Sequence, residues 1–187
     1  MRKLVLYTLM CLDGAVDHPH RYFTPTERAG QPPEFDAVMD DHEAKVIGTQ
    51  DAVLLGRNMY DEWSQYWPTV TQQPFADFIN TVKKYVVTST PLSTTWHNSE
   101  AVEGPVEDLV QDLKAQPGGD IGIHGSIRLA QSLLNANLVD ELQLVVAPAV
   151  GFPGRHLFEN PTDIRRLALR SATSTPTGSL LLTYRTP

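Results

Sequence analysis

Three segments of the sequence join glycine, hydroxyl or arginine side chains to the end of an apolar run, a combination suited to holding phosphate groups. The segments are Gly56-Arg57-Asn58-Met59, Thr88-Ser89-Thr90 and His124-Gly125-Ser126-Ile127. Glycine lets a ligand approach the backbone closely, and a helix that begins there offers free N–H groups and a partial positive charge. The guanidinium of Arg57 adds a planar donor fork, and the hydroxyls add further donors.

Each segment alone also resembles an ordinary turn, strand end or helix cap. All three segments place small or polar residues directly after an apolar run, and they recur in order along the chain. We therefore expect them to form one binding site together. In an open α/β sheet, ligands bind beyond the carboxyl ends of the strands. Three such turns along one edge are enough to grip a dinucleotide, two of them at phosphates and one at a ribose phosphate. We therefore predict a dinucleotide site at that edge of the sheet.

Apolar runs and helical patterns alternate along most of the chain and would position these segments. We expect strands near 3–10, 52–55, 84–88, 120–123 and 138–146, and helices near 35–46, 58–66, 75–82, 105–113 and 127–134. Near the C-terminus, 166–171 and 179–184 bracket the turn signal Thr175-Pro176-Thr177-Gly178. This order predicts an α/β fold with a mostly parallel central sheet, flanking helices and an antiparallel C-terminal edge hairpin.

Composition narrows the class of protein. The chain has 187 residues and a net charge of −7, which suits one domain over 1–187 and argues against nucleic-acid and membrane surfaces. A single cysteine, Cys11, excludes an internal disulfide and any multi-cysteine metal site. His18 and His20 suggest a solvated loop more than a metal site, and we expect no metal. The apolar run from Leu4 to Leu12 is read as a buried first strand and not a signal peptide, so a cytoplasmic protein is expected.

Several well-known site motifs are absent from the sequence. There is no G-x-G-x-x-G after the first strand, no G-x-x-x-x-G-K-[ST] and no G-x-S-x-G. These absences disfavour a standard Rossmann site, a P-loop and an esterase nucleophile elbow. The zinc deaminase signature is missing as well.

Asp13 and Trp67 are candidates for the substrate end of the site, and His124 is a candidate for the cofactor turn. Asp13 follows the first strand and is the first choice for a substrate-side polar or catalytic group, although it also suits a turn before Gly14. Trp67 could wall a substrate cavity or belong to the core. His124 could orient the third turn or make a structural hydrogen bond.

Several motifs together resemble the dihydrofolate-reductase-like family, in the branch similar to the C-terminal reductase domain of bacterial riboflavin-biosynthesis proteins. The matching stretches are K-L-V-L-Y-T-L-M-C-L-D-G from Lys3, L-L-G-R-N-M-Y-D from Leu54, K-Y-V-V-T from Lys84, G-G-D-I-G-I-H-G-S from Gly118 and L-V-D-E-L from Leu138. The resemblance covers nearly the whole chain. The sequence departs from the family pattern at Met59, where threonine is common, and at Asp61, which replaces glutamate.

The resemblance implies an NADPH-dependent reductase. It places Gly56, Arg57, Asn58, Met59, Thr88, Ser89 and Thr90 at the adenosine 2′-phosphate side, and His124, Gly125, Ser126 and Ile127 at the pyrophosphate. The end of the first strand, from Leu9 to Gly14, would border the nicotinamide and the substrate. The substrate implied is pteridine-like or an aminopyrimidine similar to 5-amino-6-(5-phosphoribosylamino)uracil.

Folate reductases carry a buried carboxylate on the helix after the first long loop. The corresponding stretch offers Glu34, Asp36, Asp40 and Asp41, of which Asp40 shares its helix with apolar Phe35 and Met39 and is the second catalytic candidate. The preceding segment, 17–33, departs from the folate enzymes, and its length indicates a mobile or functional loop.

Two other functions remain open at this point. One is a non-catalytic module that binds a nucleotide or metabolite in the same fold, and the other is a flavin-binding reductase. The absence of a fused deaminase domain hints at self-association, and the apolar run 142–150 could serve a homodimer.

Overall fold

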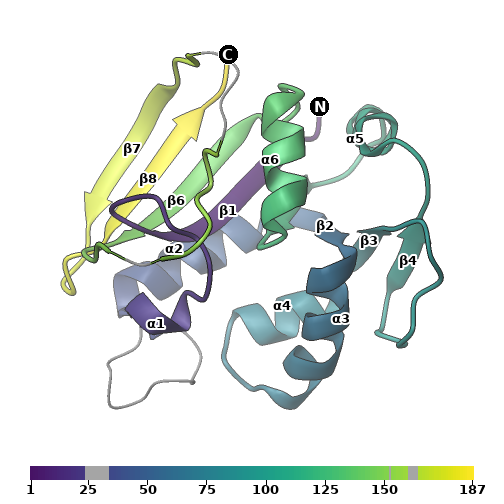
Figure 1. The fold of residues 1–187 in the computed structure, drawn as a ribbon, viewed down its shortest axis with the longest axis horizontal. Helices are drawn as coiled ribbons and strands as arrows, with labels where there is room; N and C mark the ends of the chain where they lie inside the picture. Colours follow the sequence, from purple (N-terminus) through teal and green to yellow (C-terminus); the bar gives the residue numbers. More distant parts are fainter. Residues whose placement is uncertain (24–33, 152, 160–163) are drawn as a thin grey trace.

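The computed structural model describes residues 1–23, 34–151, 153–159 and 164–187. Its centre is an eight-stranded sheet with the strand order β4-β3-β2-β5-β1-β6-β8-β7 (Figure 1). The first six strands of this order run parallel, whereas β8 is antiparallel to β6 and β7 is antiparallel to β8. The predicted α/β fold with an antiparallel C-terminal edge is therefore confirmed.

The predicted elements follow one another in the expected order, and the structure adds two that the apolar patterns do not predict, helix α1 and strand β4. The strands are β1 (Leu4–Cys11), β2 (Gln50–Gly56), β3 (Lys83–Val87), β4 (Ser99–Val102), β5 (Asp120–His124), β6 (Glu141–Ala147), β7 (Ala168–Ser174) and β8 (Leu180–Arg185). The helices are α1 (His20–Phe23), α2 (Ala37–Ile47), α3 (Arg57–Tyr66), α4 (Phe75–Thr81), α5 (Val106–Ala115) and α6 (Ile127–Asn135), with a short 3-10 turn at Trp67–Thr69.

Side chains on alternate positions of each strand build cores on the two faces of the sheet. On one face, Leu6, Leu54 and Ile123 pack with residues of α5 and α6. On the other face, one core forms around Val53 and the aromatic residues of α3 and α4, and another joins Val5 to α2. Both faces of the parallel region are thus covered, as its near-continuous apolar strands require.

One expectation about the surface is wrong. The run 142–150 was a candidate homodimer face, but its first six residues lie in β6, between β1 and β8, and all six are buried. Val150 alone of the run's large apolar side chains is well exposed. The exposed strand is instead β7, all seven residues of which are exposed.

The loop expected over 17–33 lies only partly within the described residues. Its first part contains α1, and residues 24–33 lie outside them. Among the helices that the structure describes, none has the length and apolar character needed to cross a membrane.

Candidate functional site

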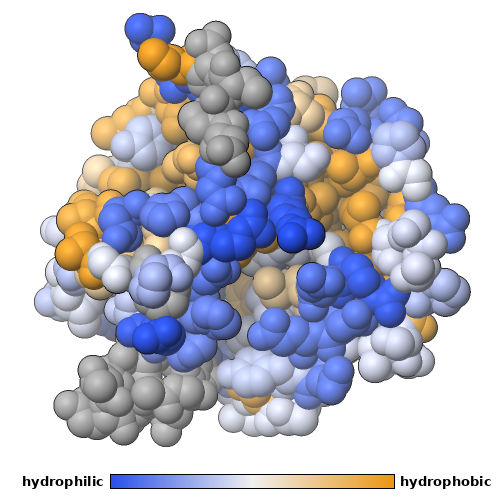
Figure 2. Space-filling view, viewed as in Figure 1, coloured by the Kyte–Doolittle hydropathy of each residue, from blue (hydrophilic) through white to orange (hydrophobic). Residues whose placement is uncertain are grey.

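The three predicted turns lie next to one another. They follow the carboxyl ends of β3, β2 and β5, which are adjacent and parallel in the sheet. Figure 2 shows polar side chains over α3 and a hollow in the surface below α6, between α2 and α3. The topology thus brings together segments that are up to 70 residues apart in sequence, such as Gly56 and Ser126.

Arg57 links the first turn to the second. Its Nε donates to both carboxylate oxygens of Asp61, at 2.9 and 2.8 Å, which places the charge pair one helical turn apart in α3. Its Nη1 donates to Oγ1 of Thr90 at 2.7 Å and to the carbonyl of Pro91 at 2.8 Å. Among the residues that the structure describes, Nη2 has only a long 3.4 Å contact with the Ser93 hydroxyl, so it is the end of the guanidinium with donor capacity left for a ligand.

A cavity of about 440 Å³ opens beside this guanidinium. It is lined by Arg57, Val87, Thr88, Ser89, Thr90 and Gly104. The hydroxyl of Thr88 donates to the carbonyl of Thr90 at 3.0 Å and accepts the N–H of Thr90, which closes the turn. Ser89 is exposed. One cation and several hydroxyls around one cavity are a donor set that fits a phosphate monoester.

The third turn is joined to the first by a hydrogen bond. The N–H of Gly56 donates to Oγ of Ser126 at 3.0 Å. Ser126 has a positive φ of 49° and does not cap α6 with its side chain, since its Oγ is turned toward Gly56. The first N–H groups of α6, beginning at Ile127, are left without that cap, and free N–H groups at a helix start are suited to an anion.

Glycine at 125 is required by close packing as well as by its backbone conformation. Its φ is +63°, and a Cβ there would stand 2.6 Å from Cε of Met59. Met59, the position that departs from the family pattern, therefore packs its thioether end against the turn. Asn58, next to it at the start of α3, is exposed.

His124 directs its side chain away from the turn and into the protein. The residue is 2% exposed, its Nε2 lies 2.8 Å from Oε1 of Gln50, and the rings of Tyr7 and Phe75 surround it. Burial lowers the pKa of His124 to about 3, so the imidazole is neutral at physiological pH. Of the two alternatives that the sequence leaves open, the structural hydrogen bond is the one present.

The end of β1 lies on the same edge of the sheet as the three turns, because β1 is parallel to β5. Leu9 is half-buried and its carbonyl accepts the hydroxyl of Tyr22 at 3.1 Å. Gly14 has a φ of +91° and turns the chain after the strand. Oδ2 of Asp13 accepts the N–H of Gly151 at 2.6 Å, and this bond lowers the pKa of Asp13. A lowered pKa makes Asp13 a poor proton donor at neutral pH.

The acidic residues of α2 differ in their environment. Asp36 is the N-cap, and its side chain accepts the N–H groups of Val38 and Met39. Asp40, one turn further along, is half-buried; burial first and the charges of Asp36 and Asp41 second raise its pKa. Asp40 therefore suits proton donation better than Asp13 does.

Glu43 is a functional candidate that our sequence analysis missed. It is 7% exposed, and burial, with a smaller contribution from the charge of Asp40, raises its pKa to about 7. The Tyr7 hydroxyl of β1 is the neighbour that opposes this rise. The signal available in the sequence was its position, three residues after Asp40 and three before the apolar pair Val46-Ile47.

Trp67 belongs to the core. It is 9% exposed, and its ring packs against Trp63 and Phe75 at centroid distances of 5.7 and 4.8 Å. Its role as a wall of the substrate cavity stays a prediction, and the structure supports the alternative that we weighed against it.

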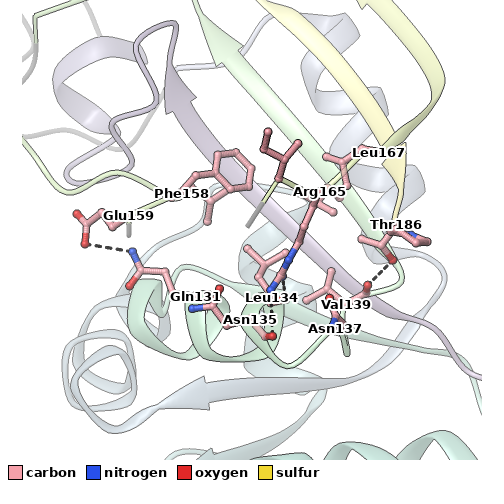
Figure 3. Close-up of a pocket in the computed structure, with 14 residues that line it drawn as sticks. Gln131, Leu134, Asn135, Asn137, Val139, Phe158, Glu159, Arg165, Leu167 and Thr186 are labelled. Carbon is pink, nitrogen blue, oxygen red and sulfur yellow. Dashed lines mark hydrogen bonds between the residues drawn. The ribbon is translucent and has the colours of Figure 1, made fainter. Parts of the chain in front are cut away.

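A second cavity, of about 600 Å³, lies away from the three turns (Figure 3). It is formed by the C-terminal half of α6, the chain around Phe158 and the end of β8. Its charged groups already have partners: Arg165 donates to the carbonyl of Asn135, and Glu159 accepts from Gln131. The lining is mostly apolar, and the cavity lies toward the amino ends of the parallel strands, so we do not assign the chemistry to it.

Known proteins identify the family of this chain. The model of the RibD C-terminal domain matches residues 2–181. The chain belongs to the RibD C-terminal domain family. It is 27% identical over 164 residues to the uncharacterized protein YyaP of Bacillus subtilis (strain 168), which covers 84% of this chain and 80% of YyaP. The resemblance to riboflavin-biosynthesis reductase domains seen in the sequence is thereby confirmed.

Several solved structures share the fold of this chain. A protein of Shewanella sp. PV-4 assigned to riboflavin biosynthesis superimposes with a TM-score of 0.74 at 17% identity and covers 99% of both chains. A pyrimidine reductase-like protein of Corynebacterium diphtheriae gives 0.66 at 16% identity, over 100% of this chain and 92% of that one. RibD of Acinetobacter baumannii gives 0.67, and this chain spans 58% of its length.

Proposed function

We propose that this protein is an NADPH-dependent reductase that transfers hydride to a pteridine-like or aminopyrimidine substrate. The observation that carries the proposal is the set of three turns at the ends of β3, β2 and β5, linked by the bonds from Arg57 to Thr90 and from Gly56 to Ser126. The RibD C-terminal domain family and its reductase-like structural neighbours support this class of activity.

The donor set of the turns fits a phosphorylated dinucleotide. Arg57 Nη2 and the hydroxyls of Thr88 and Ser89 line the cavity that would take the ribose 2′-phosphate. The uncapped start of α6 at Ile127 would take the pyrophosphate. The end of β1, from Leu9 to Gly14, would then border the nicotinamide. Bound there, the cofactor would supply the hydride.

The protein positions the substrate and the cofactor and supplies a proton. Reduction of a C=N or C=O bond leaves negative charge on the heteroatom, which must be protonated. Asp40, half-buried with a raised pKa, is the group we assign to this proton. The substrate we expect resembles 5-amino-6-(5-phosphoribosylamino)uracil, the compound named for the reductase activity of the structurally similar Thermotoga maritima protein.

Cofactor binding tests the proposal directly. We expect the protein to shift or quench NADPH fluorescence at micromolar concentration and to bind NADH more weakly, because only NADPH offers a ribose 2′-phosphate to Arg57. The variant Arg57→Ala should lose most of this preference, on the order of 10-fold or more, since a charge-assisted bond contributes about 1.5–3 kcal/mol.

The matched control is Arg170→Ala, which removes an exposed arginine from the edge strand β7. It should leave both affinities unchanged. Equal binding of NADPH and NADH by the wild-type protein, or binding of neither, contradicts the proposal. Tight NADPH binding without oxidation over a panel of heterocycles would favour the non-catalytic module instead, and a yellow purified protein would favour the flavin-binding alternative.

A further inference from the structure

The guanidinium of Arg57 is held at two of its three nitrogen atoms. Nε donates to the two carboxylate oxygens of Asp61 at 2.9 and 2.8 Å. Nη1 donates to Oγ1 of Thr90 at 2.7 Å and to the carbonyl of Pro91 at 2.8 Å. Because the guanidinium is planar and rigid, fixing two of its nitrogen atoms also fixes the direction of the third. The direction of Nη2 is therefore set by Asp61 together with the turn after β3.

The ion pair between Arg57 and Asp61 is part of a larger network. An isolated, exposed ion pair one helical turn apart holds its two side chains weakly. Here the side chains of Arg57 and Asp61 are only 25% and 38% exposed. The hydroxyl of Ser93 also donates to Oδ1 of Asp61 at 3.3 Å, so the pair joins α3 to the chain that follows β3. A network of this kind keeps a geometry that a single surface pair does not.

The acceptors around Nη1 lie in a segment that is also held without Arg57. The hydroxyl of Tyr60, a fully buried residue of α3, donates to the carbonyl of Thr94 at 2.9 Å. The hydroxyl of Ser64, one turn further along α3, lies 2.8 Å from Oγ1 of Thr94. Loss of the Asp61 carboxylate should therefore free one side of the guanidinium while the segment stays attached to α3.

We propose that Asp61 is a positioning residue that sets the preference for NADPH, because it directs Nη2 of Arg57 toward the ribose 2′-phosphate. This inference rests on the proposed function, which places that phosphate in the cavity lined by Arg57, Thr88 and Ser89. Asp61 is not among the residues that line the cavity, so it acts through Arg57. NADH has no 2′-phosphate, and its affinity should not depend on the direction of Nη2.

The charge of Asp61 makes the direction of the effect diagnostic. A carboxylate close to a phosphate repels it, so loss of the negative charge alone would strengthen the binding of NADPH. Loss of the positioning contact would weaken the binding of NADPH. A lower preference for NADPH after removal of the carboxylate therefore reports the positioning of Arg57 and not the charge of Asp61.

Fluorescence titrations with NADPH and NADH measure the ratio of the two affinities. Asp61→Ala should lower this ratio about 5-fold, which is less than the loss in Arg57→Ala, because Thr90 and Pro91 still hold Nη1. Asp61→Asn keeps an oxygen that accepts from Nε and should show a ratio equal to or above that of the wild type. Asp112→Ala, which removes an exposed carboxylate from α5, should leave the ratio unchanged.

A double variant tests whether Asp61 acts through Arg57. In the Arg57→Ala background, the further change Asp61→Ala should no longer lower the ratio, since no guanidinium is left to direct. Three results would overturn the proposal. They are a wild-type ratio in Asp61→Ala, equal losses in Asp61→Asn and Asp61→Ala, and a further loss in the double variant. A lower melting temperature of Asp61→Ala with an unchanged ratio belongs to the first of these and indicates a structural role.

NMR spectroscopy of the cofactor-free protein tests the positioning contact without any ligand. The Nε–H signal of Arg57, identified by its loss in Arg57→Ala, should exchange slowly with solvent in the wild type and in Asp61→Asn. It should exchange faster in Asp61→Ala, and equal exchange rates in these proteins contradict the contact. If the wild type binds neither cofactor, the proposed function fails and the preference assigned to Asp61 fails with it. If the wild type prefers NADPH and Asp61→Ala does so equally, only the role of Asp61 is refuted.

Discussion

The buried carboxyl group of Glu43 links the stability of the fold to pH. Its pKa is about 7 in the folded protein and 4.5 when unperturbed, so the folded state binds the proton more tightly. This contribution to stability is complete below about pH 4.5 and is lost as pH rises through 7. A difference of this size corresponds to on the order of 3 kcal/mol in the free energy of unfolding.

Glu43→Gln should therefore flatten the stability curve between pH 5 and 8, since glutamine imitates the neutral acid. Urea unfolding at a series of pH values measures the effect. Glu103→Gln, which replaces an exposed carboxylate, should leave the curve as it is. A wild-type protein that gains stability over this range through Glu43 would contradict the assignment.

His124 links the stability of the fold to pH in the opposite direction from Glu43. Its folded pKa, about 3, lies below the ordinary 6.5, so its contribution to stability is present above pH 6.5 and is lost as pH falls toward 3. We expect His124→Gln to lose less stability on acidification than the wild type, although it is less stable at pH 7 because the contact with Gln50 changes. Thermal melts between pH 4 and 7 report both effects.

For single residues, the sequence shows which side chains could bind an anion, but it does not show how each side chain is surrounded in the fold. The turn residues Gly56, Arg57 and Ser126 stand out because their types alone suit an anion. Glu43 does not, since a carboxylate in a helix normally faces water, and only the tertiary packing against Tyr7 shows that this one is enclosed. The same limit applies to Arg57, whose acceptors Thr90 and Pro91 come from another strand end.

At the level of elements, the bond from Gly56 to Ser126 fixes the distance between the starts of α3 and α6. Ser126→Ala removes the acceptor and leaves the Gly56 N–H to find another partner. We expect a loss of about 1–2 kcal/mol in the free energy of unfolding and a weaker affinity for NADPH. Isothermal titration and urea unfolding measure the two quantities.

Ser132→Ala, in the same helix but away from the turn, is the control and should leave NADPH affinity unchanged. If Ser126→Ala binds NADPH as the wild type does, the link between the two turns has no part in holding the cofactor.

Elements with strong apolar patterns are predictable, and those without them are not. The helix expected from the spacing of Val38, Met39 and Val46 is α2, which ends at Gly48 as predicted. Strand β4 (Ser99–Val102) has no buried residue, so nothing in its pattern distinguishes it from a loop. It exists because β3 offers it a partner, a pairing that sequence periodicity does not contain.

For the whole molecule, an apolar surface is exposed at the end of the sheet. Leu169 of β7 and Leu180 of β8 are 56% and 38% exposed, and no helix covers this hairpin on the side shown in Figure 1. We propose that a homodimer uses this surface, since β6 is enclosed and offers none. Light scattering after size exclusion should give twice the chain mass of 20.8 kDa.

Leu169→Lys should shift that mass toward the monomer, because it places a charge on the exposed face of the edge strand. Glu103→Gln, far from the hairpin in the sequence, should leave the mass unchanged. A wild-type protein that elutes as a monomer at high concentration contradicts the expected dimer.

The cross-links among the three turns have a consequence for how a long ligand is recognised. The first turn is joined to the second by the side chain of Arg57, which donates to Thr90, and to the third by the side chain of Ser126, which accepts the Gly56 N–H. A fragment that orders one turn lowers the conformational entropy that its neighbour still has to lose. Adenosine 2′,5′-bisphosphate and nicotinamide mononucleotide should accordingly bind with positive cooperativity. Each of the two fragments should show a higher affinity when the other is present.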